Sequence, residues 1–318
     1  MTGAPAPLGY LQTAGPHADP ATALTWGLLI ISVVVVVIMT ALVAAGVVVR
    51  RAPRGADAAL REGPNAHGWF YIGLPLTCIT LVVSAIWTFQ VLAAVNSPAG
   101  QPALTIQVVG HQWWWEVRYE GKAPGEGFVT ANEIHIPAGR PVLVEVTGAD
   151  VIHSFWIPAL AGKTDTIPGR MNLTWLQADH PGLYRGQCTE YCGAQHAHMA
   201  VYAIADAPAA FEAWRQAQLA PAPAPVAPQA IAGAQVFQAH CSACHAVRGT
   251  EAAGIVGPDL THLMSRQTLA AGALPNGEAS LAGWVSNPQA IKPEAKMPAT
   301  NLSGPELNAV VAYLETLK

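Results

Sequence analysis

Two long apolar segments near the N-terminus constrain this chain more than any other feature. No charged residue occurs from Trp26 to Val49 or from Trp69 to Val95. Each run exceeds the roughly 20 residues that a helix needs to cross a bilayer, and membrane helices tolerate an internal proline such as Pro75. A cleaved signal peptide is the alternative for the first run, although that run is long and no basic segment precedes it. We predict two transmembrane helices, at about residues 26–49 and 69–95.

The arginines between the two runs predict how the chain is oriented. Arg50, Arg51, Arg54 and Arg61 lie in this short loop, and no lysine or arginine precedes the first run. Short basic loops stay in the cytoplasm. We therefore expect both termini, and everything after about residue 96, on the outer side of a bacterial cytoplasmic membrane.

Composition agrees with a membrane protein and argues against a nucleic-acid-binding one. Of the 318 residues, 52% are hydrophobic and only 11% are charged, which is too apolar for an ordinary soluble protein. The formal net charge is −4, and no basic face for phosphate is visible, so we expect no nucleic-acid partner. A chain of this length has room for two or three domains.

The exported part is predicted to form two domains. Residues 97–217 contain short β-rich runs separated by turns with glycine and proline, which is typical of a small β-sandwich. The clearest of these runs are Thr105–Val109, Glu133–Ile136, Val142–Val146 and Met199–Ile204. Residues 218–228 are rich in proline and alanine and favour an extended spacer. Residues 229–318 have helical patterns at both ends, and the last pattern opens with Ser303 and Glu306 at the spacing of a capping box.

Soft metal ligands are concentrated in one short segment of the first exported domain. Cys188, Cys192, His196 and Met199 lie within one loop, and thiolate, imidazole and thioether together suit copper better than magnesium or calcium. A mononuclear blue-copper centre uses one cysteine, so two cysteines that bridge two copper ions would explain the second thiolate. On these residues alone, a disulfide between Cys188 and Cys192 or a zinc site is the alternative.

The second exported domain carries the attachment signal of a c-type haem. In the run Cys241-Ser-Ala-Cys244-His245, the two thiols bond to the haem and the histidine becomes an axial ligand of the iron. Met264 and Met297 are the two methionines after this motif and are the candidates for the sixth ligand. Ligation by histidine and methionine favours an electron carrier over an oxygen-binding haem.

The loop with the soft ligands resembles the copper A signature of subunit II of cytochrome c oxidase, C-x-E-x-C-x-x-x-H-x-x-M, at every position. Residues 110–116 (GHQWWWE), 150–158 (DVIHSFWIP) and 163–170 (KTDTIPGR) are also similar to segments of that family. The resemblance implies a dinuclear copper site whose ligands are His153, Cys188, Cys192, His196, Met199 and the backbone carbonyl of Glu190. It also implies that the Glu190 carboxylate helps to hold magnesium against subunit I, and that Trp113 mediates electron transfer. Packing at an interface is the alternative role for Trp113.

The haem-binding part resembles small cytochromes c. Residues 291–298 (IKPEAKMP) resemble the loop that supplies the methionine ligand, which favours Met297 as the sixth ligand and leaves Met264 as a core residue. Residues 257–260 (GPDL) resemble the segment whose proline carbonyl orients the axial histidine. Trp284 is similar to a residue that packs beside the haem propionates, although core packing explains it nearly as well. The expected haem c ligands and attachment points are Cys241, Cys244, His245 and Met297.

Together these features resemble subunit II of the haem-fused branch of cytochrome c oxidases. The resemblance implies a multidomain fold, with a two-helix transmembrane hairpin, a cupredoxin-like β-sandwich and a small all-α cytochrome c domain. It implies an enzyme subunit that passes electrons from a donor cytochrome through haem c and copper A to subunit I, where oxygen is reduced to water with proton pumping. The implied partners are subunit I, subunit III, and cytochrome c or a quinol–cytochrome c reductase as donor. The electron-accepting subunit of a nitrogen-oxide reductase and a membrane-anchored redox carrier are the alternatives.

One departure from the family concerns proton uptake. Relatives usually carry a carboxylate at the cytoplasmic start of the second helix. This chain has Ala66-His67-Gly68 there, and Glu62 is the nearest carboxylate. The resemblance therefore leaves open where such a path would begin.

Overall fold

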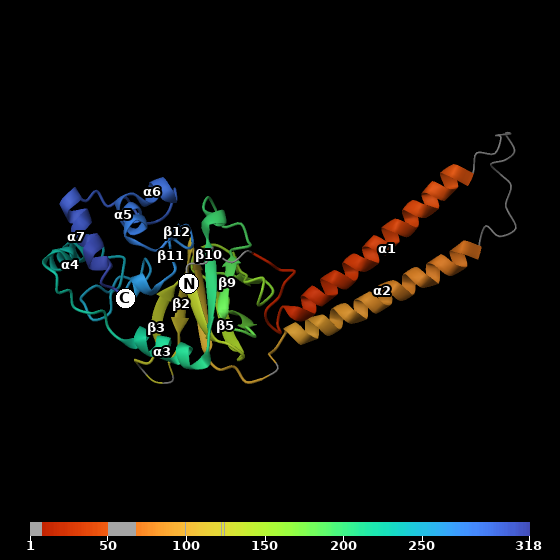
Figure 1. Ribbon diagram of the computed structural model, residues 1–318, viewed down its shortest axis with the longest axis horizontal. Helices are drawn as coiled ribbons and strands as arrows, with labels where there is room; N and C mark the ends of the chain where they lie inside the picture. The colour runs from red at the N-terminus through yellow and green to blue at the C-terminus, as the bar shows by residue number, and fades with distance from the viewer. Residues whose placement is uncertain (1–7, 50–67, 99, 122, 124) are drawn as a thin grey trace. The chain divides into compact units, whose positions relative to one another are not determined.

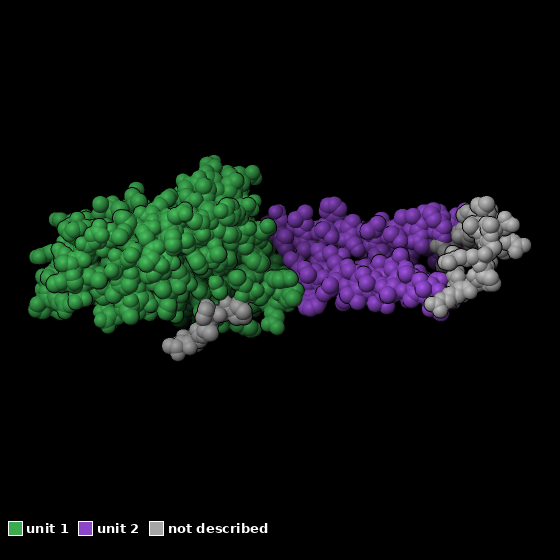
Figure 2. Space-filling view, turned by 90° about the horizontal axis from the view of Figure 1, so that it is seen from above, with its two compact units in different colours: residues 1–18, 97–318 green, residues 19–96 purple. Residues whose placement is uncertain are grey.

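The computed structural model describes residues 8–49, 68–98, 100–121, 123 and 125–318. Residues 19–96 belong to one compact unit, and the rest of the described chain belongs to the other (Figure 2). Most of the segment between the two apolar runs, including the four arginines that predict the orientation and the Ala66-His67 pair, lies outside the described residues.

The smaller unit is a pair of long helices. α1 (Asp19–Val49) and α2 (Gly68–Val95) lie side by side, and the ring of Trp87 lies against Gly27 (Figure 1). α1 begins at Asp19 rather than near Trp26, because an acidic residue followed by Pro20 suits the first turn of a helix. Both helices are long and apolar enough to cross a membrane. Their apolar side chains are largely exposed, which is expected of a surface that lipid covers.

The larger unit contains a β-sandwich of two main sheets. The first sheet has the strand order β3-β2-β1-β5-β8 and the second has the order β4-β10-β9, while β6 and β7 form a separate pair. The strands are β1 (Thr105–His111), β2 (Trp114–Tyr119), β3 (Phe128–Ala131), β4 (Glu133–Pro137), β5 (Val142–Gly148), β6 (His153–Phe155), β7 (Thr164–Thr166), β8 (Asn172–Leu176), β9 (Gly182–Gln187) and β10 (Ala200–Asp206). Alternate residues of β5 are buried, as expected of a strand with one face on the core. The core is apolar and includes Ile106, Ile136, Val144 and Val201.

The four strands predicted from the sequence correspond to β1, β4, β5 and β10. The other strands of the sandwich escaped prediction because they are short, as in β6 and β7, or lack alternation, as in β2, where three consecutive residues are buried. The region also ends in a helix, α3 (Pro208–Leu219), which the sequence patterns did not predict. α3 is fixed by Phe211, which is buried in the sandwich core, and by Trp214, which stacks on His135 with ring centroids 3.9 Å apart.

Residues 220–227 follow α3 as an extended segment and lead into a small helical domain. Its helices are α4 (Pro228–His240), α5 (Glu278–Ser286), α6 (Pro288–Ile291) and α7 (Gly304–Leu314), with a single 3-10 turn, η3 (Leu263–Ser265), and a two-residue ladder of β11 (Thr268–Leu269) and β12 (Leu274–Pro275). α4 and α7 pack together at Gly233, where a Cβ would lie 1.9 Å from the carbonyl oxygen of Ala309. The predicted capping box at Ser303 and Glu306 is confirmed. The fold class is therefore the predicted one, with a short β-ladder added to the helical domain.

Candidate copper and haem sites

The candidate copper ligands are placed by three strands of the sandwich. His153 opens β6, and the loop between β9 and β10 carries the two cysteines, His196 in the 3-10 turn η2 (His196–His198), and Met199. The loop is closed by a hydrogen bond from the backbone N–H of Cys188 to the carbonyl of Met199, at 3.0 Å. This hydrogen bond joins the two ends of the loop, so the residues between them can face the same point.

The structure brings all the predicted copper ligands together. The Sγ atoms of Cys188 and Cys192 lie 3.7 Å apart and occupy the middle of the cluster. Cys188 Sγ lies 3.9 Å from His153 Nδ1 and 3.3 Å from the Glu190 carbonyl oxygen. Cys192 Sγ lies 3.5 Å from His196 Nδ1 and 3.9 Å from Met199 Sδ.

The chemistry of this donor set fits copper. Both cysteines are free and buried, and their separation is well beyond a disulfide bond, so the disulfide alternative does not hold in this structure. The hydrogen bond from Cys192, together with His153 and nearby backbone groups, lowers the pKa of Cys188 despite its burial. The thiolate is the form that binds metal. Two thiolates, two imidazoles, a thioether and a carbonyl would give two copper ions a mainly soft set of ligands.

Polar groups behind the ligands hold them in place. Asp150 Oδ1 pairs with His153 Nε2 at 2.9 Å, so the other ring nitrogen, Nδ1, is the one that faces the thiols. Although burial opposes ionisation, hydrogen bonds from His153, the backbone of Gln112 and Lys296 hold the pKa of Asp150 well below its usual value. Trp113 Nε1 and Gln112 Nε2 donate to the Cys192 carbonyl at 2.9 and 2.8 Å.

Gly193 allows the predicted electron-transfer residue to approach this loop. Trp113 is buried, and a Cβ on Gly193 would lie 2.9 Å from its indole ring. The backbone of Gly193 has φ +116°, a conformation that side-chain-bearing residues rarely adopt. The indole therefore lies close to the part of the loop between Cys192 and His196.

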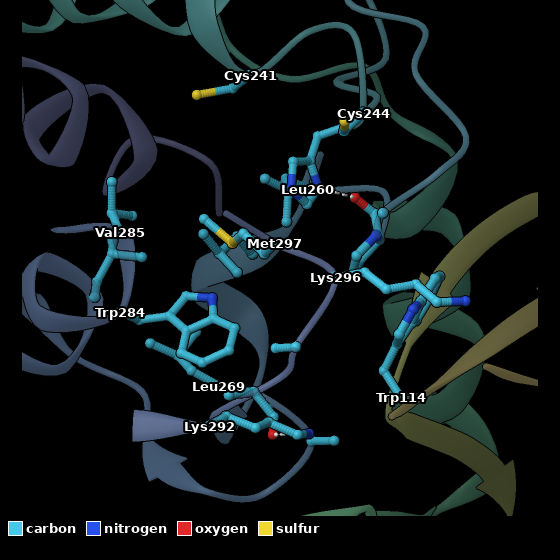
Figure 3. Close-up of a pocket in the computed structure, with 18 of the residues that line it drawn as sticks. Trp114, Cys241, Cys244, Leu260, Leu269, Trp284, Val285, Lys292, Lys296 and Met297 are labelled. Carbon is cyan, nitrogen blue, oxygen red and sulfur yellow. Dashed lines mark hydrogen bonds between the residues drawn. The ribbon is translucent and has the colours of Figure 1, made fainter. Parts of the chain in front are cut away.

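The haem motif borders a cavity of about 310 Å³. Its lining includes Cys241, Cys244, His245 and Met297, and Figure 3 shows Met297 pointing into the space below the two cysteines. His245 Nδ1 is 2.8 Å from the Pro258 carbonyl oxygen, as the resemblance to small cytochromes c predicts, which leaves Nε2 for a metal. Cavity walls that are mainly apolar suit a porphyrin, so the residues present fit a haem.

Two further observations concern residues that the sequence singled out near this motif. Trp284 lines the cavity, whereas Met264 packs against the domain core and is not among the lining residues. The copper domain also contributes to the wall, because Trp113 and Trp114 line the same cavity as Cys244, and Figure 3 shows Trp114 beside Lys296. The haem cavity and the copper loop therefore share Trp113 as a neighbour.

Comparison with known proteins decides the family. Residues 126–205 match the model of the cytochrome c oxidase subunit II periplasmic domain, and residues 230–318 match that of cytochrome c. Cytochrome c oxidase subunit 2 of Alkalihalophilus pseudofirmus is 39% identical over 253 residues, which cover 79% of this chain and 72% of the relative. The chain belongs to the cytochrome c oxidase subunit 2 family. The subunit 2 of Bacillus sp. strain PS3 is 32% identical over 266 residues, covering 79% of this chain and 73% of the relative.

A solved structure is also similar. The crystal structure of the periplasmic domain of subunit II of cytochrome oxidase of Bradyrhizobium japonicum shows 34% identity and covers 38% of this chain and 96% of that chain, with a TM-score of 0.35. For this chain, membership of the subunit 2 family implies a copper A site, and its cytochrome c domain implies haem c. Membership also implies a membrane-anchored protein with periplasmic domains that works in a complex with subunit I.

The structure also shows which residues of this subunit 2 chain do not join the clusters. His198 Nδ1 pairs with the side chain of its neighbour Gln195, and His111 pairs with Glu116 and stacks on Trp114. The Glu190 side chain is exposed, so a magnesium site there would need ligands from another subunit.

Sequence reasoning missed the residues that join the two domains. Lys292, Lys296 and Glu133 make contacts across the boundary between the sandwich and the cytochrome domain. The two lysines lie in the segment that was identified only by its resemblance to a methionine loop. Because the sequence has few charged residues, the charge of these two lysines was the one signal that they have a role.

Proposed function

We propose that this chain is subunit II of a proton-pumping cytochrome c oxidase, and that it carries electrons from a donor cytochrome through its own haem c and copper A to subunit I. The observation that carries the proposal is the pair of buried, free thiols of Cys188 and Cys192, 3.7 Å apart, with one imidazole beside each. Copper bound there would share one electron between two metal ions, and haem c would supply a second one-electron site. Such a subunit delivers electrons, and oxygen is reduced in its partner.

The residues of this chain would act by holding and insulating the two centres. His153, Cys188, Cys192, His196, Met199 and the Glu190 carbonyl would bind copper, while Cys241, Cys244, His245 and Met297 would bind haem. Burial of the thiols keeps water away from the ligands, and the strands at both ends of the loop limit movement when the charge changes. Trp113, packed on the copper loop and lining the haem cavity, is the residue we assign to electron transfer between them.

The finer organisation follows from the same proposal. We assign residues 1–96 to the N-terminal segment with two membrane crossings, 97–217 to the copper domain, 218–228 to the linker and 229–318 to the cytochrome domain. Both termini would lie on the periplasmic side, with subunit III as a further partner and cytochrome c or a quinol–cytochrome c reductase as donor. The exposed Glu190 carboxylate would hold magnesium with groups from subunit I.

Electron paramagnetic resonance on the complete chain, with haem attached and copper loaded, tests this function. We expect the hyperfine pattern of one electron shared by two equivalent copper ions, and its loss in Cys188→Ser. Cys78→Ser is the matched control, because Cys78 lies in α2 and is not one of the candidate ligands. A mononuclear copper spectrum in the unmodified chain would refute the dinuclear site and, with it, the proposed function.

A further inference from the structure

The loop that carries Met297 reaches the copper domain through two lysines. Lys292 Nζ donates to the carbonyl of Trp113 at 2.6 Å and to that of Ala270 at 3.1 Å. Lys296 Nζ pairs with Asp150 Oδ2 at 2.9 Å. Figure 3 places both lysines beside the cavity into which Met297 points. The segment that would supply a haem ligand is therefore the same segment that contacts the copper domain.

Each lysine ends on a residue that itself holds a copper ligand. Trp113 donates its indole N–H to the carbonyl of Cys192, and Asp150 pairs with the imidazole of His153. The chain thus has two hydrogen-bonded routes from one side of the haem cavity to two different copper ligands. Neither route crosses the extended linker.

The two routes differ in how firmly they can hold. Lys296 is 57% exposed, and a surface ion pair of this kind contributes little to stability and weakens with salt. Lys292 is 3% exposed and bonds to two backbone carbonyls, which cannot swing away as side chains do. Of the two lysines, the buried one is therefore the firmer contact between the loop and the copper domain.

We propose that Lys292 is the positioning residue for electron transfer within this chain, because its buried ammonium seats the Met297 loop on the backbone of Trp113 and so sets the separation of haem and copper. The inference rests on the proposed function, since it needs both cofactors. It goes further, because it assigns a role at the domain boundary to a residue that binds neither of them.

The energetics separate this role from simple structural support. Burial lowers the pKa of Lys292 to about 7, which shows that its charge is poorly solvated there. Replacing Lys292 by methionine removes this charge and keeps the length of the side chain, but it leaves the carbonyls of Trp113 and Ala270 without their donor. If Lys292 only supports the fold, Lys292→Met would lower stability and keep the rate of electron transfer. If it positions the loop, the variant keeps its fold and its cofactors but transfers electrons more slowly.

The test is the single-turnover rate of electron transfer from haem c to copper A in the intact oxidase, after rapid photochemical reduction of the haem. Lys292→Met should slow this step about tenfold or more, since small displacements of reacting centres have effects of that size. The haem absorption spectrum, the copper resonance spectrum and both midpoint potentials should stay unchanged. Glu294→Gln is the matched control, because it removes a charge from an exposed side chain of the same loop and should leave the rate unchanged.

Lys292→Gln is a second variant, for the case in which Lys292→Met loses haem. The shorter glutamine side chain does not extend to the carbonyl of Trp113 either. A rate within about twofold of the unmodified oxidase, in either variant with both spectra intact, would overturn the positioning role. Failure of the proposed function has a different signature. In that case the unmodified oxidase itself would lack the copper A spectrum or the haem-to-copper step.

Discussion

Nε2 of His153 lies 2.9 Å from Oδ1 of Asp150, while Nδ1 of the same ring lies 3.9 Å from the Cys188 thiol. The imidazole is thus held on one edge by a carboxylate and turned with its other edge toward the metal-binding sulfurs. Partners of this kind fix the orientation of a ligand and raise its basicity. Asp150 therefore belongs to the proposed copper site as the residue that orients His153.

Replacing Asp150 by asparagine should weaken copper binding. The amide keeps the size of the side chain but loses the charge that orients His153, and removal of such a partner costs about 10- to 100-fold in metal affinity. The measurement is copper retention against a chelator, followed by the copper A absorption. Asp179→Asn, at an exposed carboxylate of the same domain, should retain copper as the unmodified protein does. Equal retention in both variants would contradict the role of Asp150.

The two histidines of the η2 turn should behave differently on substitution. His196→Asn removes an imidazole 3.5 Å from the Cys192 thiol, so the shared-electron copper spectrum should be lost or become that of a single copper ion. His198→Asn removes a ring that contacts Gln195 instead and should leave the spectrum intact. Resonance spectra of both copper-loaded chains check this, and a normal spectrum in His196→Asn would remove His196 from the ligand set.

Met297 and Met264 offer a similar comparison for the haem. Met297→Leu should abolish the spectrum of histidine–methionine ligation and lower the midpoint potential on the order of 0.1 V, because the axial ligand controls the potential. Met264→Leu exchanges one apolar core side chain for another and should change neither property. Optical redox titration of both variants measures the difference. An unchanged spectrum in Met297→Leu would mean that another group supplies the sixth ligand.

Glu133 should make stability depend on pH. Its carboxylate accepts hydrogen bonds from the backbone of Gln267 and Thr268, yet burial raises its pKa from 4.5 to about 7. The folded chain therefore holds this proton where the unfolded chain has lost it. The contribution of Glu133 to the free energy of unfolding is therefore greatest below about pH 4.5, and about 3 kcal/mol of it is lost as the pH rises to about 7.

Glu133→Gln should remove that pH dependence. The measurement is the thermal unfolding midpoint of the complete chain between those two pH values. Glu251→Gln, at an exposed position, should keep the slope of the unmodified chain. If the slope is the same in all three proteins, the Glu133 carboxyl does not titrate as its burial requires.

Short motifs made much of the candidate site predictable. A c-type haem attachment needs thiols and an imidazole in fixed order, and the copper loop needs its ligands within one turn of chain, so both are visible as letter patterns. Long apolar runs predicted α1 and α2, because a helix that pairs its own backbone groups is one of the few structures that can cross lipid. His153 was placed only by resemblance, since its contact with Cys188 depends on how β6 and β9 pack.

Contacts between domains could not be predicted from the sequence. In the sequence, Lys292 looks like an ordinary surface lysine, and only the structure shows that it is buried and bonded to Trp113. Glu133 begins a strand, and the pattern of that strand does not predict which groups face its carboxylate. Such pairs depend on two folded surfaces meeting, and no local periodicity records that. The same limit applies to α3, whose helix is held by Phe211 and Trp214 on the sandwich rather than by a clear amphipathic pattern.

The extended segment 220–227 has a consequence for how the two domains stay together. Ala222 N donates to the Arg248 carbonyl at 2.8 Å, and the Ala220 carbonyl lies 3.1 Å from His262 Nε2, so this stretch is bound along the cytochrome surface and is not a free tether. A loose tether holds its two ends together only statistically, and its influence falls gradually as it lengthens. Here the bound segment and the hydrogen bonds across the domain boundary specify the same arrangement, so the position of the cytochrome domain does not depend on how far a free chain could stretch.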